Sequence, residues 1–264
     1  MPEGHTIHRL ARDLRKDLTQ RNVPVSSPQG RFAESACVLD GDVVSRVEAA
    51  GKHLFMHWES DQILHIHLGL IGKFRPYPVN DPLTGEIRLR LEGEKTAWHL
   101  TGPQTCVLVE PAVVAGVLDG LGPDPLRRDG RRGDFVDRIA GSKKAVGAIL
   151  LDQDVIAGIG NVFRSELLFM VGIHPSTPSN SLTEDQADEI WNIAADLLRV
   201  GVKLNRIVTV TPEDAGAARW RLSDDERLYA YKREGLPCRR CGTEIVIGKV
   251  ANRSMWWCPR CQPG

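Results

Sequence analysis

The sequence of 264 residues contains no apolar run of about 18 residues, the length that a helix needs to cross a membrane. It also lacks an apolar signal segment at its start, so we expect an intracellular chain in which cysteine thiols stay reduced. An excess of one charge is missing as well, because 34 lysines and arginines balance 34 aspartates and glutamates. A net charge of zero by itself argues against a nucleic-acid-binding protein, unless positive charge gathers on one face.

Cysteine is scarce, but four of the six cysteines are grouped near the end of the sequence. Cys238 and Cys241 precede Cys258 and Cys261 in a CxxC-x16-CxxC pattern, which is typical of a structural zinc site. Each CxxC directs two thiolates at one ion, and the residues between the pairs suffice for a hairpin that completes a tetrahedron. Two disulfides are the weaker alternative, because an intracellular compartment keeps thiols reduced.

Four other candidate ligands are set aside. Cys37 and Cys106 lie in apolar surroundings, and we expect both to be buried core thiols without chemistry. His65 and His67 alternate onto one face of a predicted strand. With no third ligand nearby, we interpret them as a structural pair rather than as a metal site.

Positive charge is concentrated locally although the total is zero. It collects in residues 127–144 and in the cysteine hairpin, where Glu234 and Glu244 are outnumbered. The basic residues of the hairpin are Lys232, Arg233, Arg239, Arg240, Lys249, Arg253 and Arg260. A basic zinc hairpin is typical of nucleic-acid binding.

The first half of the sequence predicts one helix followed by a β-rich region. Residues 3–18 carry apolar side chains at helical spacing, which predicts an amphipathic helix. Its apolar face comprises Ile7, Leu10, Ala11, Leu14 and Leu18. From about residue 43 to residue 109, short β-rich runs alternate with turn residues, and an antiparallel sandwich accounts for them best. The Gly-, Pro- and Arg-rich residues 121–133 indicate a domain boundary.

The second half is predicted to be mostly helical up to the cysteine hairpin. Residues 142–153 and 160–172 predict two helices, and a longer third helix opens at Ser181 or Thr183.

The joint between the first two of these helices is a candidate phosphate site. Gly158 and Gly160 permit close backbone approach, and the helix that begins near Asn161 presents free amides at the positive end of its dipole. A plain interhelical turn with Asn161 as the N-cap is the alternative.

The start of the chain, Met1-Pro2-Glu3, is a candidate nucleophile. We expect Met1 to be removed before a residue as small as proline, which exposes a secondary amine. An α-amino group is partly neutral near neutral pH, and the positive end of the following helix favours the neutral form further. Such an amine can attack a carbon that bears a leaving group, with Glu3 as proton donor or acceptor. The alternative is a proline placed in the first helical turn for conformational reasons.

In combination, these stretches resemble the formamidopyrimidine-DNA glycosylase and endonuclease VIII family over nearly the whole chain, in the same order. The family-like motifs are PEGH (2–5), GKHL (51–54), HLGLIGKFR (67–75), LGPDPL (121–126), LLDQDVIAGIGNVFRSELLF (150–169), GIHP (172–175), YKREGLPCRRCG (231–242) and RSMWWCPRCQ (253–262). The resemblance implies an α+β fold of an N-terminal antiparallel β-sandwich with an N-terminal helix (1–120), a helix-two-turn-helix domain (121–230) and a four-cysteine zinc finger (231–264).

The resemblance also implies an activity and its partners. We expect a bifunctional DNA glycosylase and abasic-site lyase, acting by β,δ-elimination in base-excision repair, with one structural Zn²⁺ and no other cofactor. Its partner is damaged DNA, duplex or partly single-stranded, from which family members flip out the damaged nucleotide. We expect a monomer that does not bind membranes, in the bacterial cytoplasm at the nucleoid.

The family roles carry over to four candidate catalytic residues of this sequence. Pro2 resembles the nucleophile that attacks the sugar C1′, releases the base and leaves a Schiff base with the opened deoxyribose, and Glu3 resembles its acid-base partner. Lys52 is similar to the lysine near the phosphate of the flipped nucleotide, where it helps the first elimination. Arg253 resembles the arginine that grips phosphate and supports the second elimination, a task that suits a guanidinium because it bonds two phosphate oxygens at once.

Three further residues match DNA-binding positions of the family. Asn161 and the amides around Gly160 resemble the phosphate contacts of the helix-two-turn-helix module, and Lys143 stands at the place of a DNA-contacting lysine. Leu70 occupies the position of the wedge that enters the helix as the nucleotide leaves.

Departures from the family pattern indicate to which branch of the family the sequence is most similar. Residues 101–110 lack the arginine-rich loop of the oxoguanine-specific branch, and residues 206–228 lack its Ser/Thr-rich lesion-capping signature. Gly147 replaces a frequent lysine, and Lys232 replaces the usual glycine before the zinc hairpin. The missing Ser/Thr-rich signature and Gly147 favour the endonuclease VIII side and oxidised pyrimidines, and the N-terminal PEGHTIHRLA resembles the second actinobacterial paralogue. A catalytically weak damaged-DNA or abasic-site sensor and a zinc-ribbon RNA-binding protein are the alternatives.

Overall fold

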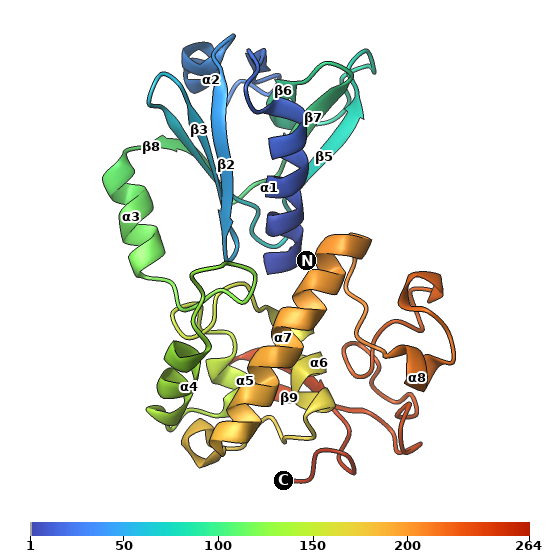
Figure 1. Ribbon diagram of the computed structural model, residues 1–264. Coiled ribbons are helices and arrows are strands. Elements are labelled where there is room, and N and C mark those ends of the chain that lie inside the picture. Colours follow the sequence, from blue (N-terminus) through green and yellow to red (C-terminus); the bar gives the residue numbers. More distant parts are fainter. Residues whose placement is uncertain (1) are drawn as a thin grey trace. The chain divides into compact units, whose positions relative to one another are not determined.

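The computed structural model describes residues 2–264 and divides the chain into two units, one up to Gly120 and one from Leu121 to Gly264 (Figure 1). The expected removal of Met1 lies outside the described residues. Unit 1 contains antiparallel sheets and unit 2 is mainly helical, which confirms the α+β fold class. No helix in residues 2–264 is both long enough and apolar enough to span a membrane.

Unit 1 begins with α1 (Gly4–Leu18), the dark blue helix of Figure 1. All five side chains of the predicted apolar face are buried in the core of the unit, which confirms this helix. The helix continues to Leu18 because its apolar residues recur at helical spacing on the face that packs against β2 (Val44–Ala50). Its last turn carries Arg15 and Lys16, which suit the negative end of the helix dipole.

Two four-stranded sheets form the rest of the core of unit 1. One sheet has the order β2-β3-β4-β8, with β3 (His53–Trp58), β4 (Ile63–His67) and β8 (Thr105–Val109). The other has the order β1-β6-β7-β5, with β1 (Val25–Ser26), β6 (Ile87–Glu92), β7 (Thr96–Thr101) and β5 (Lys73–Pro78). The β-rich runs predicted between residues 43 and 109 form strands β2 to β8, and every strand pair of unit 1 is antiparallel.

Two short helices of unit 1 were not predicted from the spacing of apolar residues. α2 (Ala33–Leu39) buries Ala36 and Leu39 but leaves Cys37 exposed, so the expectation that Cys37 is a core thiol is wrong. A helix turns through about 100° per residue, and the residue next to a buried Ala36 therefore points away from the core. Cys106 is buried as expected, and burial raises the pKa of its thiol to about 12. α3 (Pro111–Asp119) covers the other face of the β2-β3-β4-β8 sheet.

Unit 2 is built around α7 (Glu184–Leu204), the long orange helix of Figure 1, which packs against α4 (Arg132–Ala140) and α6 (Asn161–Met170). Thr183 is its N-cap and forms a reciprocal capping box with Gln186, which decides between the two predicted starts. Short elements follow in α8 (Pro212–Ala215) and in the hairpin of β9 (Val246–Val250) and β10 (Arg253–Trp257).

The predicted helix over residues 142–153 is much shorter in the structure. α5 comprises only Val146–Ile149, because the amides of Val146 and Gly147 bond to carbonyls of residues 177 and 175 instead of starting a longer helix. A β-carbon on Gly147 would lie 2.9 Å from the Pro175 carbonyl oxygen. This close approach explains why the position is occupied by glycine here.

Candidate active site and nucleic-acid interface

The register of α1 against β2 places Lys52 at the end of unit 1 where α1 begins. Thr19, just after the helix, pairs with Val44 at the start of β2, and the Arg15 guanidinium donates to the Val47 carbonyl at 2.7 Å. β2 therefore runs back along α1 towards the first helical turn, and the tight β2–β3 turn with Lys52 follows its last residue. In Figure 1 the first turn of α1 and the tip of the β2–β3 hairpin lie at the same end of the unit.

The strand register brings two further turns to this end, which we call the catalytic edge. His53 at the start of β3 pairs with His67 at the end of β4, so the β4–β5 turn with Leu70 lies beside the Lys52 turn. His67 also pairs with Thr105, and the Gln104 amide donates to the His67 carbonyl at 2.9 Å. The catalytic edge thus joins the start of α1 to the β2–β3, β4–β5 and β7–β8 turns.

Pro2 and Glu3 stand immediately before α1. Pro2 is half-buried, whereas Glu3 is completely buried and serves as the N-cap residue in extended backbone geometry. The Glu3 carbonyl accepts the Thr6 amide at 2.9 Å, which fixes the entry into the helix. No acidic residue lies in the first turn of α1, so the positive end of its dipole acts on Pro2 with Glu3 as the nearest carboxylate in sequence.

Three histidine rings lie together on the sheet beside Lys52. His53 joins the predicted pair because its Nδ1 lies 2.9 Å from the Nε2 of His65 and its ring lies 4.9 Å from that of His67. Burial, followed by the other two histidines and Lys52, lowers the pKa of His53 to about 4. Within residues 2–264, these rings do not form a group that could hold a metal ion. At neutral pH they remain uncharged and leave Lys52 as the cation of this part of the edge.

The β4–β5 turn presents two apolar side chains to solvent. Leu70 is 64% exposed and Ile71 is 78% exposed, while Leu68 just before them is buried in the core. Gly69 has a φ of +66° and its amide donates to the Nδ1 of His67 at 3.2 Å. The turn joins β4 of one sheet to β5 of the other. Its tip exposes two apolar side chains that take no part in packing the core.

In unit 2, the residues before α6 form a tight turn that leads into the N-terminus of this helix. Gly158 adopts a φ of +92°, and the side chain of Gln153 accepts the Gly158 amide at 3.0 Å and donates to the Ile159 carbonyl at 2.9 Å. Gly160 is the N-cap residue and supplies no side-chain cap, so the alternative with Asn161 as the N-cap is wrong. The positive end of the α6 dipole lies at this turn.

The Asn161 side chain forms a hydrogen bond with β10 of the zinc hairpin. Its Nδ2 donates to the Ser254 carbonyl at 3.1 Å, and its Oδ1 is buried without a hydrogen-bond partner among the described residues. Arg164, one turn later, is completely buried and donates to the carbonyls of Gly147 at 2.6 Å and Ser254 at 3.1 Å. α6 therefore holds the β10 strand that starts with Arg253, whose own side chain is exposed.

A buried carboxylate on α6 organises the segment that leads to the zinc hairpin. Glu166 is completely buried and accepts the Tyr229 amide at 2.7 Å and the Ala230 and Tyr231 amides at 2.8 Å each. It also accepts the hydroxyl of Thr209. Four donors on one carboxylate satisfy its charge away from water and fix the path of residues 229–231.

The four cysteine sulfurs converge as the spacing predicts. All four lie within 4.8 Å of one another, with Cys238 and Cys261 separated by 3.9 Å and Cys241 and Cys258 by 3.5 Å. Zinc–sulfur bonds of about 2.3 Å in a tetrahedron place the sulfurs about 3.8 Å apart. The thiols therefore fit one Zn²⁺ in a structural role, and each comes from a turn next to the β9–β10 hairpin.

Not every basic residue of this region is available for a ligand. Arg233 is buried and donates to the Tyr229 and Pro237 carbonyls, and Arg240 pairs with Asp214 at 3.2 Å. Arg253, Lys249 and Arg260 are exposed, as is Lys143 in unit 2. Lys143 forms no ion pair with a described residue, whereas its neighbour Lys144 pairs with Asp152 at 2.6 Å. Of these two neighbouring lysines, only Lys144 is held by an ion pair with a described residue.

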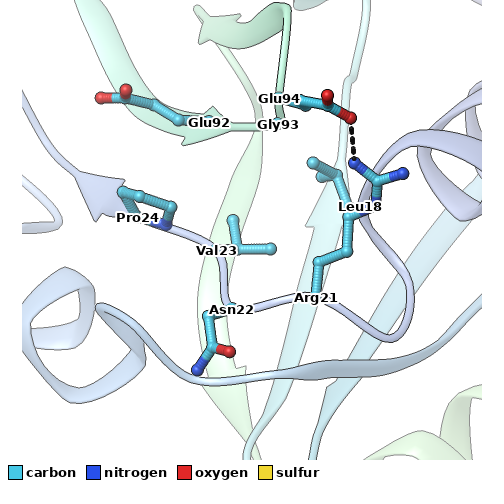
Figure 2. A pocket seen from close by; sticks show the side chains of 8 residues that line it. All are labelled: Leu18, Arg21, Asn22, Val23, Pro24, Glu92, Gly93 and Glu94. Carbon is cyan, nitrogen blue, oxygen red and sulfur yellow. Dashed lines mark hydrogen bonds and ion pairs between the residues drawn. The ribbon is translucent and has the colours of Figure 1, made fainter.

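A surface pocket of unit 1 lies away from the catalytic edge, at the opposite end of α1 (Figure 2). It is lined by Leu18, Arg21, Asn22, Val23, Pro24, Glu92, Gly93 and Glu94. Arg21 pairs with Glu94 at 3.1 Å, and Asn22 donates to the Gly41 carbonyl at 2.7 Å. Because these polar groups are already satisfied, the pocket does not resemble a site of chemistry.

Known protein families match three consecutive parts of the chain. The formamidopyrimidine-DNA glycosylase N-terminal domain matches residues 1–106, the formamidopyrimidine-DNA glycosylase H2TH domain matches residues 121–212, and the zinc finger found in FPG and IleRS matches residues 235–264. The sequence is 43% identical to "Endonuclease 8 1" of Mycobacterium tuberculosis over 99% of this chain and 100% of that relative. The chain belongs to the formamidopyrimidine-DNA glycosylase and endonuclease VIII family. It is accordingly a base-excision-repair enzyme, a DNA glycosylase and abasic-site lyase with a zinc finger.

Other relatives refine this placement. The sequence is 34% identical to "Endonuclease 8 2" of Mycobacterium bovis over 99% of this chain and 100% of that relative. Identity is thus higher to the first actinobacterial paralogue than to the second, against the resemblance suggested by the N-terminal motif. Solved structures of Lactococcus lactis Fpg share the fold: a complex with DNA containing N7-benzyl-Fapy-dG has a TM-score of 0.83 at 24% identity and covers 100% of both chains.

Several residues of the edge and the interface were missed by sequence reasoning. Ile71 follows the predicted wedge and is more exposed than Leu70, and two consecutive apolar residues between glycines were the available signal. Arg164 and Glu166 are the two charged residues of α6, and charged side chains that are buried in a helix are paired or hydrogen-bonded. Apart from its position in the family-like motif, nothing in the sequence indicated that Gln153 holds the turn before α6.

Proposed function

We propose that the enzyme removes oxidised pyrimidines through a Schiff base to Pro2. The observation that carries this proposal is the catalytic edge, where strand register brings the start of α1, the Lys52 turn and the Leu70 turn to one end of unit 1. In this reaction the Pro2 nitrogen attacks C1′ of the damaged nucleotide, the glycosidic bond breaks and the base leaves with a proton. The Pro2 nitrogen then gives up its own proton, and the C1′–O4′ bond opens as O4′ is protonated, which leaves an iminium between Pro2 and C1′. The resulting iminium makes the protons at C2′ acidic, which allows elimination of the 3′ phosphate and then of the 5′ phosphate.

The side chains of the edge suit the roles proposed for them. Glu3 is buried beside Pro2, where it can protonate the ring oxygen or take a proton from the amine. Lys52 is a cation next to neutral histidines, which supports its proposed role of holding a phosphate of the flipped nucleotide. In unit 2, Arg253, Asn161 and Lys143 are proposed to hold the DNA backbone, with the Asn161 side chain acting mainly through its bond to Ser254.

The lesion preference is proposed from the turns of the edge. The β7–β8 turn is short and carries Gln104 where an arginine-rich loop would reach the opposite strand. The wedge is supplied by Leu70 and Ile71 from the β4–β5 turn, so that apolar side chains replace the stacking of the everted nucleotide. We further propose that the enzyme acts as a monomer in the cytoplasm, at the nucleoid.

Excision rates on matched duplexes test the lesion preference. One duplex carries an oxidised pyrimidine opposite guanine or adenine and the other carries 8-oxoguanine opposite cytosine. We expect the pyrimidine to be released at least about tenfold faster, a difference of about 1.4 kcal/mol in transition-state stabilisation. Faster release of 8-oxoguanine would contradict the pyrimidine preference and leave the glycosylase assignment intact.

A further inference from the structure

A short 3₁₀ turn of unit 2, η2 (Arg219–Arg221), exposes an indole that packing does not account for. Trp220 is 63% exposed, whereas the other five tryptophans of the described chain are buried or half-buried. Trp is among the side chains that gain most from burial, so one left in solvent on a stable turn is typical of a binding surface.

The turn holds Trp220 in place from both sides. Leu222, directly after the turn, is buried in a cluster of unit 2. The Arg206 guanidinium donates to the Trp220 carbonyl at 3.1 Å, and the Nε of Arg219 donates to the Val210 carbonyl at 3.3 Å. The backbone of the turn is therefore anchored, and the indole is presented by a fixed element instead of a free loop.

The surroundings of Trp220 carry positive charge. The Arg221 guanidinium lies 4.8 Å from the centroid of the indole. None of Arg206, Arg219 and Arg221 forms an ion pair with a carboxylate in the part of the chain that the structure describes. Three acidic residues follow the turn: Asp224 pairs with Arg227 at 2.9 Å, and Asp225 and Glu226 share the single proton of the Ser223 hydroxyl, whose oxygen lies 2.6 Å from each carboxylate.

We propose that Trp220 and Arg221 form a stacking site for an unpaired base of single-stranded DNA. An aromatic face stacks on any base, and adjacent arginines attract the phosphates of the same strand. In an intact duplex both faces of each base are already stacked, so the site selects strands with unpaired bases. This inference rests on the proposed function in that DNA is the substrate, and it assigns two residues to the binding of the single-stranded part of that DNA.

Affinities for two lesion-free ligands test the stacking site directly. The zinc-loaded full chain is titrated into a dye-labelled oligo(dT) strand and into a duplex of equal length, for the wild type, Trp220→Ala, Trp220→Phe and Arg221→Ala. We expect Trp220→Ala to lower the ratio of single-strand to duplex affinity about tenfold, within the range known for loss of one base–aromatic stack. Trp220→Phe keeps a ring and should restore most of the ratio. Arg221→Ala should weaken single-strand binding and reduce its salt dependence.

A matched control and two contrary outcomes make the test decisive. Val113→Ala removes a comparably exposed apolar side chain from α3 and should leave the ratio unchanged. An unchanged ratio for Trp220→Ala overturns the proposal. So does a Trp220→Ala defect confined to excision from duplex DNA, which would mean that the indole covers the everted lesion. Adduct formation by the wild type on a duplex abasic site is measured alongside: its absence contradicts the proposed function, while the affinity ratio still decides the stacking site.

Discussion

Replacing Arg164 by methionine is expected to destabilise unit 2 by about 3–5 kcal/mol. The guanidinium is completely buried and donates to the Gly147 carbonyl at 2.6 Å and the Ser254 carbonyl at 3.1 Å. A hydrogen bond to a charged group contributes about 1.5–3 kcal/mol, so these two bonds give about 3–6 kcal/mol, and packing of the methionine recovers a part. The two longer contacts, at 3.4 Å and 3.5 Å to the Val250 and Arg253 carbonyls, add little.

Urea unfolding of the zinc-loaded full chain measures this loss, with tryptophan fluorescence reporting on unit 2 through Trp191 and Trp256. Arg164→Lys keeps the charge and can keep one of the bonds, so we expect it to lose about half as much. Arg199→Met is the matched control, because Arg199 is exposed on α7 and its pair with Asp196 should contribute less than about 0.5 kcal/mol.

The reasoning would be refuted if Arg164→Met lost less than about 1 kcal/mol, since a buried carbonyl that loses its donor should cost at least that much. A further consequence concerns DNA. Because Arg164 fixes the strand that carries Arg253, the variant should also bind abasic-site DNA more weakly at temperatures where unit 2 remains folded.

Three other perturbations test the edge, the histidines and the zinc site. Gly69→Ala should lower both Tm and the rate of excision. Its φ of +66° and a β-carbon 2.9 Å from the Gln104 Cβ force the turn that carries Leu70 to move. A kcat/KM for excision equal to that of the wild type would argue against Leu70 and Ile71 as the wedge. Burial is the main cause that lowers the pKa of His65 from 6.5 to about 4 in the folded chain. As the pH falls, the unfolded chain therefore takes up this proton at a higher pH than the folded chain does. Stability should therefore be complete above pH 6.5 and fall by roughly 2–3 kcal/mol as pH drops to 4, and His65→Phe should flatten this dependence in urea titrations at each pH. Cys258→Ser should lose zinc and DNA binding together, as measured by metal analysis and by anisotropy; full duplex affinity without zinc would contradict the role of the hairpin.

Local patterns in the sequence predicted the elements that position the site. The apolar spacing of residues 3–18 and the cysteine spacing each depend on neighbours within one element or one hairpin, and both agree with the structure. Cys37 shows the limit of such patterns, because an apolar neighbourhood does not say which side of a two-turn helix faces the core. Lys232 adopts a φ of +57°, which explains why a glycine suits this position in the family-like motif.

The pairing of strands and the packing of residues distant in the sequence determine the features of the site that sequence patterns did not predict. His53 joins His65 and His67 only because β3 pairs with β4 in the observed register, and no spacing in the sequence specifies that pairing. Arg164 and Glu166 lie in a buried helix, but most of their partners are more than sixty positions away, in the hairpin and in the segment before it. Such partners depend on tertiary packing, which local propensity does not encode.

The central claim is that Pro2 forms the covalent intermediate, and borohydride trapping tests it most directly. The purified protein without Met1 is incubated with borohydride and a duplex that contains one abasic site, next to Pro2→Gly and Glu3→Gln. The account predicts a covalent protein–DNA adduct that Pro2→Gly weakens or abolishes, and on a duplex with an oxidised pyrimidine an adduct that also requires Glu3. Tight binding of the abasic duplex without any adduct would contradict the account and identify the protein as a sensor of damaged DNA.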